Sequence, residues 1–149
     1  MSVFIDTNVL VRMIEVADPM HDAAVRAVTA LIRSGEALII TPQIVAEFWS
    51  VATRPRDRNG IGLMPDAAGA ELAGIHNFFT VVAESADVYD TWKNLVVSYG
   101  VSGVAAHDAR IAAAMKVYGI GRILTFNGQD FARYPDIEVV DPRKYFPQL

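Results

Sequence analysis

The 149-residue sequence contains no cysteine, so the chain forms neither a disulfide nor a thiolate metal site, and a reducing compartment suits it. We expect no secretion signal in the first residues, because Asp6 and Arg12 interrupt the apolar run. No apolar run approaches the ~20 residues that are needed to cross a bilayer. We therefore expect a cytoplasmic protein that makes no contact with a membrane.

The chain also lacks an excess of positive charge, since 13 Lys and Arg stand against 17 Asp and Glu, a net charge of −4. This balance argues against a broad basic surface that binds nucleic acid without specificity. It is compatible with a nuclease, because a cluster of metal-binding acids lowers the net charge by itself. The three histidines show no metal-ligand spacing with one another.

Hydrophobic residues make up 52% of the chain and charged residues 20%, which predicts a folded protein. The length suits one core, and no linker or repeat divides the sequence, so we predict a single domain over residues 1–149. Short apolar runs predict strands at 3–5, 37–40, 78–83, 122–125 and 137–140, with helical patterns between them. This alternation predicts an α/β fold with a parallel sheet covered on both faces.

Polar residues follow several of the predicted strands. Asp6 ends the first strand, Glu47 lies in the helix after the second, and Asn127 follows the fourth. Ligands of parallel sheets bind beyond the carboxyl ends of the strands, so we expect these residues to share one rim. Taken singly, Asp6 also suits a helix cap, Glu47 a solvated side chain, and Asn127 and Asp130 turn residues.

Asp108 is the most informative residue of the sequence. Helical spacing predicts that it shares an apolar face with four residues: Val104, Ile111, Ala112 and Met115. Aspartate is rarely buried without a partner, and a position near a helix N-terminus favours a carboxylate. Capping of a neighbouring backbone or pairing with a buried arginine is the alternative interpretation.

Several carboxylates at one rim repel one another and raise each other's pKa values unless a cation lies among them. An all-oxygen set of ligands favours Mg²⁺ or Mn²⁺. Such an ion in an open acidic site suits phosphoryl chemistry.

The motifs in this order resemble the PIN-domain ribonucleases, in particular the VapC-like toxins of type II toxin–antitoxin pairs. The resemblance rests on residues 4–8, on Glu47, on residues 107–109 and on residues 125–131, and it covers nearly the whole chain. It implies a three-layer α/β/α sandwich around a central parallel sheet of about five strands. It also implies an endoribonuclease that depends on Mg²⁺ or Mn²⁺.

The resemblance assigns Asp6 and Asp108 as the metal ligands, with Glu47 as a third catalytic acid. Thr7 and Asn8 would then hold Asp6 in place through hydrogen bonds. The reaction expected is in-line attack of an activated water on an RNA phosphodiester, which leaves a 3′-hydroxyl and a 5′-phosphate.

The fourth position departs from the acidic pattern, because Asn127 stands where many members of the family carry aspartate. Asn127 supplies a neutral oxygen, and Asp130 would act through water. We therefore expect one firmly bound ion.

Arg54, Arg56 and Arg58 lie on one loop and are candidates to bind RNA phosphates, with a solvated loop as the alternative. The resemblance further implies a cognate antitoxin protein that covers the rim, and a homodimer formed through apolar helices.

Two other functions compete with this one. A phosphatase of the haloacid dehalogenase type also opens with a strand that ends in aspartate, but it needs a second aspartate where this chain has Asn8. A PIN-like binding module that has lost catalysis is favoured only by Asn127.

Overall fold

A parallel sheet of five strands crosses the computed structural model, which describes residues 1–145. The strand order is β3-β2-β1-β4-β5, and every neighbouring pair is parallel. The strands are β1 (Ser2–Ile5), β2 (Ala37–Ile40), β3 (Thr80–Val81), β4 (Arg122–Leu124) and β5 (Glu138–Val140). The first strand in the sequence is therefore the central strand of the sheet.

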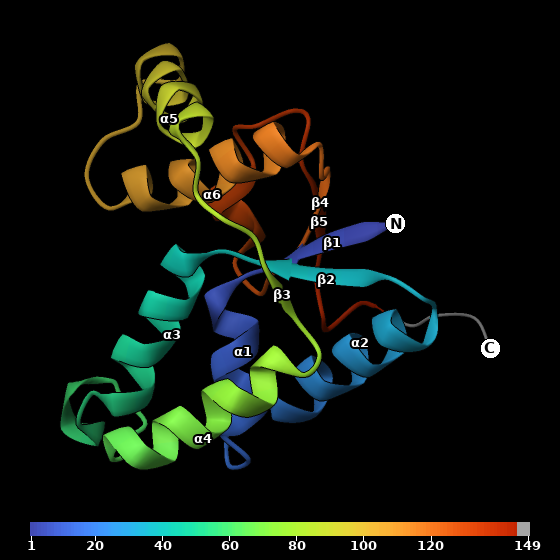
Figure 1. The fold of residues 1–149 in the computed structure, drawn as a ribbon, viewed down its shortest axis with the longest axis vertical. Helices are drawn as coiled ribbons and strands as arrows, with labels where there is room; N and C mark the ends of the chain where they lie inside the picture. Colours follow the sequence, from blue (N-terminus) through green and yellow to red (C-terminus); the bar gives the residue numbers. More distant parts are fainter. Residues whose placement is uncertain (146–149) are drawn as a thin grey trace.

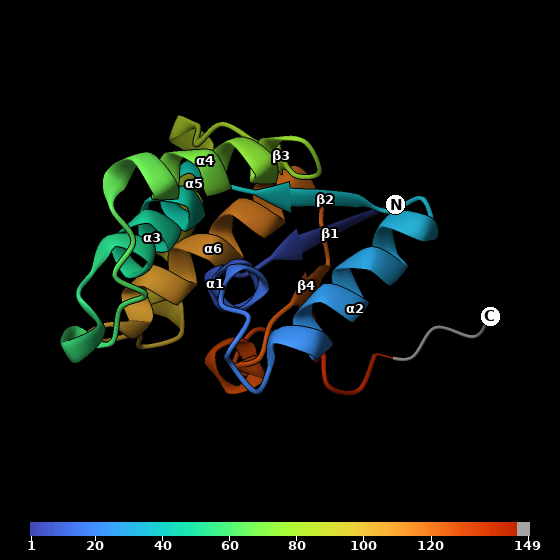
Figure 2. The same cartoon turned by 90° about the horizontal axis from the view of Figure 1, so that it is seen from below.

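Six α-helices form the two outer layers (Figure 1). They are α1 (Thr7–Ile14), α2 (His21–Arg33), α3 (Pro42–Thr53), α4 (Pro65–His76), α5 (Ala86–Ser98) and α6 (Ala105–Tyr118). In Figure 1, α5 and α6 lie above the sheet and α1, α2 and α4 lie below it. Figure 2 shows α1 and α2 from below, in front of the strands. The predicted three-layer α/β/α sandwich is confirmed.

The chain direction explains this division. The chain moves from β1 to β2 and then to β3 in one direction across the sheet, and it returns past β1 to reach β4. Because crossover connections between parallel strands are right-handed, the helices of the return connection cover the opposite face.

The central strand is completely covered. Val3, Phe4 and Ile5 are 0% exposed, because β1 has neighbours on both edges and helices on both faces. Their burial holds the residue that follows, Asp6, at the carboxyl edge of the sheet. The backbone N–H of Asp6 donates to the carbonyl of Leu124 at the end of β4, so both strands end together.

Several predicted element boundaries were wrong. The third strand is Thr80–Val81 and not 78–83, because the N–H groups of Phe78 and Phe79 bond back to Ile75 at the end of α4. The first helix begins directly after the first strand, at Thr7, because Asp6 is its N-cap. Within residues 1–145, no helix combines the length and the apolar character that a membrane span requires.

Candidate active site

An open hollow of about 400 Å³ lies beyond the carboxyl ends of β1 and β4. Side chains from separate segments line it: Asp6 after β1, Glu47 on α3, Asp108 on α6, and Asn127 and Asp130 after β4. The structure thus brings together every acid that the sequence analysis placed at the rim.

Asp6 is 6% exposed and is held by three hydrogen bonds. Its Oδ1 accepts from the backbone N–H of Thr7 at 2.7 Å, which makes it the cap of α1. Its Oδ2 accepts from the hydroxyl of Thr125 at 2.8 Å and from Nδ2 of Asn8 at 3.3 Å. The interpretation of Asp6 as a helix cap is therefore correct, and the same carboxyl also lines the hollow.

Glu47 is fixed from two sides. Its Oε2 accepts from the hydroxyl of Thr7 at 2.7 Å, and its Oε1 accepts from Nε2 of Gln43 at 2.9 Å. Nε2 of Gln43 also donates to the carbonyl of His107 at 2.9 Å, next to Asp108 in α6. These bonds orient Glu47 toward the hollow, so it is not a freely solvated side chain.

Gln43, which is 8% exposed, was not predicted from the sequence as part of the site. The available signal was its position four residues before Glu47, which places both side chains on the same face of α3. A buried amide needs partners, and Gln43 finds them on α3 and α6.

Asp108 lies in the first turn of α6 and is half-buried. Burial is the main cause that raises its pKa, the charges of Asp130, Asp6 and Glu47 also raise it, and Arg133 lowers it, so that the pKa is about 7. Within residues 1–145 its carboxyl accepts no hydrogen bond and forms no ion pair, so neither the cap nor the arginine pair applies. The predicted shared face was partly wrong, because Val104 precedes the helix and is 84% exposed.

The pKa of Asp6 is also affected by repulsion from the neighbouring acids. Burial raises its pKa, hydrogen bonds from Thr125 and Thr7 lower it, and the charges of Glu47 and Asp130 raise it again. Each acid thus makes ionisation of the others less favourable, and a cation in the hollow would reverse that effect. In the described part of the chain, no group of three or more Asp, Glu or His side chains is close enough together to coordinate one metal ion.

The turn after β4 completes the edge of the hollow. The backbone N–H of Asn127 donates to Oγ1 of Thr125 at 3.0 Å, and Asn127 precedes the short helix η2 (Gly128–Phe131) that carries Asp130. Both side chains are exposed toward the hollow that they line.

The structure does not bring the three loop arginines into the hollow. Arg54 is half-buried at the end of α3, Arg56 is paired with Glu15 at 3.0 Å, and Arg58 is exposed. Their loop instead borders the hollow through three following residues: Asn59, Gly60 and Ile61. Among the described residues that line it, the basic side chain is Arg12, which the sequence analysis did not single out.

A family model described as the PIN domain matches residues 3–137, which is most of the chain. Comparison with curated protein sequences yields no match.

Solved structures share the fold at low sequence identity. The VapC20 toxin of Mycobacterium tuberculosis, described as cleaving the sarcin-ricin loop, has a TM-score of 0.68 at 22% identity, covering 89% of this chain and 95% of that one. VapBC-1 of nontypeable Haemophilus influenzae has a TM-score of 0.70 at 16% identity, with 97% and 100% covered. A toxin–antitoxin complex from Klebsiella pneumoniae has a TM-score of 0.63 at 19% identity, with 94% and 97% covered.

Proposed function

This chain belongs to the PIN-domain family, and on that premise we propose that it is an endoribonuclease that depends on Mg²⁺ or Mn²⁺. We further propose that it is the toxin of a type II toxin–antitoxin pair. The observation that supports the activity best is the meeting of Asp6, Glu47, Asp108 and Asp130 at one open hollow. The description of the structurally similar VapC20 as an RNA-loop cleaving toxin supports the choice of substrate.

The residues present fit a hard divalent cation held by few protein ligands. Mg²⁺ typically keeps several waters and binds through one or two carboxylates, so it does not require a cage of three side chains. Asp6 and Asp108 suit this role, because each lines the hollow and each has a raised pKa that a nearby positive charge would lower. Glu47 and Asn127 would bond to waters around the ion.

The ion, when bound, supplies a Lewis acid for the phosphodiester and lowers the pKa of water. The protein side chains hold the catalytic carboxylates in a fixed orientation. Hydrogen bonds from Thr7, Asn8 and Thr125 keep Asp6 from turning, and those from Thr7 and Gln43 keep Glu47 from turning. We expect in-line attack of water on the RNA phosphodiester, with a 3′-hydroxyl and a 5′-phosphate as products.

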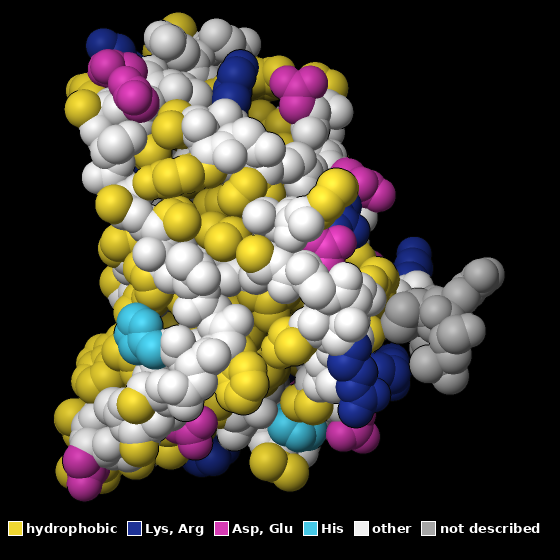
Figure 3. All heavy atoms as spheres, turned by 45° about the vertical axis from the view of Figure 1, so that its right-hand side comes forward, with side chains coloured by type: hydrophobic (Ala, Val, Ile, Leu, Met, Phe, Trp, Pro, Cys, Tyr) yellow, Lys and Arg dark blue, Asp and Glu magenta, His cyan; other side chains and the backbone are white. Residues whose placement is uncertain are grey.

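The partner proposed is a cognate antitoxin protein that closes the hollow. Toxin–antitoxin complexes among the similar structures support it. A homodimer is proposed through apolar surface that the helices leave exposed. An apolar groove between α3 and α4 is lined by residues such as Val45, Trp49 and Leu72. Figure 3 shows hydrophobic side chains, in yellow, exposed over one face of the molecule.

Cleavage of RNA by the purified protein tests the activity. We expect cleavage with Mg²⁺ or Mn²⁺, none in excess EDTA, and none by the Asp6→Asn and Asp108→Asn variants, which should remain folded. Asp90→Asn, on the exposed side of α5, is the matched control and should cleave normally. Full activity in excess EDTA would contradict the dependence on metal.

Expression in cells tests the role as a toxin. We expect growth arrest from the chain alone, relief by co-expression of a short reading frame just upstream, and no arrest by Asp108→Asn. If the chain is instead a binding module without catalysis, its expression should not arrest growth. The RNA assay should then show no cleavage at any metal concentration, although the acids are retained. The phosphatase alternative has no support, because the chain belongs to the PIN-domain family.

A further inference from the structure

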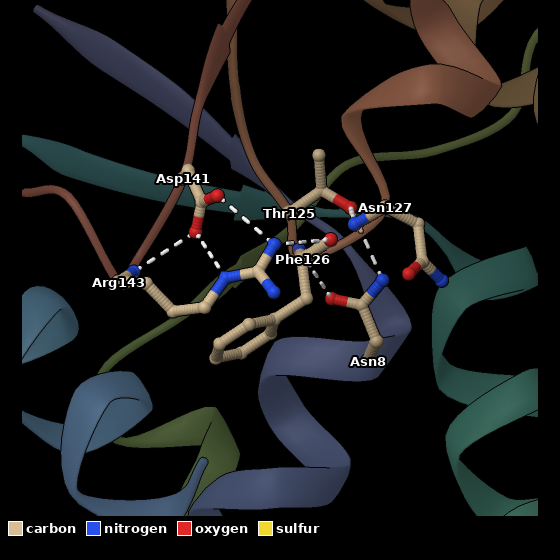
Figure 4. A network of polar contacts seen from close by, with 6 residues as sticks. All are labelled: Asn8, Thr125, Phe126, Asn127, Asp141 and Arg143. Carbon is tan, nitrogen blue, oxygen red and sulfur yellow. Dashed lines mark hydrogen bonds and ion pairs between the residues drawn. The ribbon is translucent and has the colours of Figure 1, made fainter.

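The segment that follows β5 reaches back to the site through Arg143. Asp141 accepts three hydrogen bonds from this residue: from its backbone N–H at 2.9 Å, from Nε at 3.0 Å and from Nη2 at 3.0 Å. The fork of the guanidinium is thereby fixed in one orientation. In that orientation Nη2 also donates to the carbonyl of Phe126 at 3.0 Å (Figure 4).

The carbonyl of Phe126 and the N–H of Asn127 belong to the same peptide group, which is planar. The carbonyl accepts from Arg143, and the N–H donates to Oγ1 of Thr125 at 3.0 Å. The hydroxyl of Thr125 in turn donates to Oδ2 of Asp6 at 2.8 Å. One rigid group therefore connects Arg143 to the hydroxyl that holds Asp6.

The hydroxyl of Thr125 has no freedom left in this arrangement. A hydroxyl has one proton to donate and two lone pairs that accept. Its lone pairs accept from the N–H of Asn127 and from Nδ2 of Asn8 at 3.1 Å, so its proton is directed at Asp6. Asn8 is itself held by the N–H of Phe126, which donates to its Oδ1 at 3.1 Å.

We infer that Arg143 is a positioning residue for Asp6, acting through the peptide group between Phe126 and Asn127 and through the hydroxyl of Thr125. Without Arg143 the carbonyl of Phe126 loses this donor, and the peptide group is free to turn its N–H away from Thr125. The hydroxyl is then no longer committed to Asp6. The inference rests on the proposed function, because the proposed function makes Asp6 a metal ligand.

Binding of Mn²⁺ to the purified full chain, measured by electron paramagnetic resonance, tests the inference without any cleavage assay. We expect Arg143→Ala to weaken Mn²⁺ binding by about tenfold, as is typical when a group that orients a metal ligand is removed. Arg143→Lys keeps one donor for Phe126 but loses the fork on Asp141, and it should lie between that variant and the wild type.

Arg122→Ala is the matched control. Arg122 pairs with Glu36 at 2.6 Å. It lies at the amino end of β4, the strand that Thr125 follows, and does not line the hollow. We expect its Mn²⁺ affinity to stay within about twofold of the wild type. Normal Mn²⁺ binding by Arg143→Ala, or equal losses in Arg143→Ala and Arg122→Ala, would overturn the inference.

A crystal structure of Arg143→Ala separates this inference from the proposed function. Absence of Mn²⁺ binding by the wild type would contradict the metal-dependent activity alone. The positioning role is then decided by the structure. It stands if the bond from Asn127 to Thr125 or the bond from Thr125 to Asp6 is broken, and it falls if both are kept.

Discussion

The hydroxyl of Thr7 donates a 2.7 Å hydrogen bond to Oε2 of Glu47, which lies 40 positions later in the chain. The backbone N–H of the same threonine donates to Oδ1 of Asp6, also at 2.7 Å. One residue at the start of α1 thus orients two of the candidate catalytic acids. Thr7 was expected to hold Asp6, and it does so through its backbone, while its side chain holds Glu47.

Thr7→Val tests the value of this hydroxyl. Valine keeps the shape and the backbone N–H but leaves Oε2 of Glu47 without its donor. We expect the rate of RNA cleavage at saturating substrate to fall by about tenfold, with KM for RNA unchanged. Thr7→Ser keeps the hydroxyl and should retain most of the rate, so equal rates in the two variants would contradict the role.

Asp108 predicts how the stability of the metal-free protein depends on pH. Its pKa rises from 3.8 in the unfolded chain to about 7 in the folded one, so between these values the folded state holds a proton that the unfolded state has lost. This contribution is complete below the unfolded pKa and is lost as pH rises through the folded pKa.

Asp108→Asn removes the charge and should therefore stabilise the metal-free protein at about pH 8. We expect a gain of about 1–2 kcal/mol, less than the full pKa shift would give, because the carboxyl is half-buried and partly screened by solvent. The difference should shrink as pH falls from about 7 and should disappear below the unfolded pKa of 3.8, where both states are protonated. Urea denaturation in EDTA measures it, with Asp90→Asn as the control variant. A stability difference that does not change with pH would contradict this prediction.

If the loop arginines bind RNA phosphates, their removal should reduce the salt dependence of RNA binding. Replacement of Arg54, Arg56 and Arg58 by alanine should weaken RNA binding in an Asp108→Asn background, which prevents cleavage. The slope of log Kd against log salt should fall by about 0.7 for each phosphate contact that is lost.

An equal loss of charge elsewhere provides the control for this experiment. Replacement of Arg33, Lys93 and Lys116, which are exposed on α2, α5 and α6, removes the same three charges. If both triple variants reduce the slope equally, the loop arginines contribute only their net charge and the solvated-loop interpretation holds.

Gly60 limits the loop that borders the hollow. A Cβ atom at this position would lie 1.9 Å from the carbonyl oxygen of Arg54, so the backbone must move to accept a side chain. We expect Gly60→Ala to lower the free energy of unfolding by about 1–3 kcal/mol and to reduce cleavage. Gly69→Ala, where a Cβ meets nothing within 4 Å in α4, should instead stabilise by about 0.5–1 kcal/mol. Denaturation curves of both variants measure these effects.

Local patterns were sufficient to predict much of the fold. The strand Ala37–Ile40 has the predicted bounds, because its continuous apolar run ends at Thr41, the cap of the next helix. Thr41 caps α3 through a hydrogen bond from the N–H of Ile44, as threonine before proline predicts. The third strand was predicted too long, since composition alone does not show that Phe78 and Phe79 bond back to a helix.

The parallel sheet, the rim at its carboxyl edge and the acids that lie there could all be predicted from the sequence. Each of these follows from local apolar patterns and from the direction of parallel strands. The way in which the acids are held depends on the folded chain. Gln43, Thr125 and Arg143 reach the site through hydrogen bonds to segments far along the chain, and no local pattern encodes such contacts. The raised pKa values likewise depend on burial and on distances between distant segments, which exist only after the chain has folded.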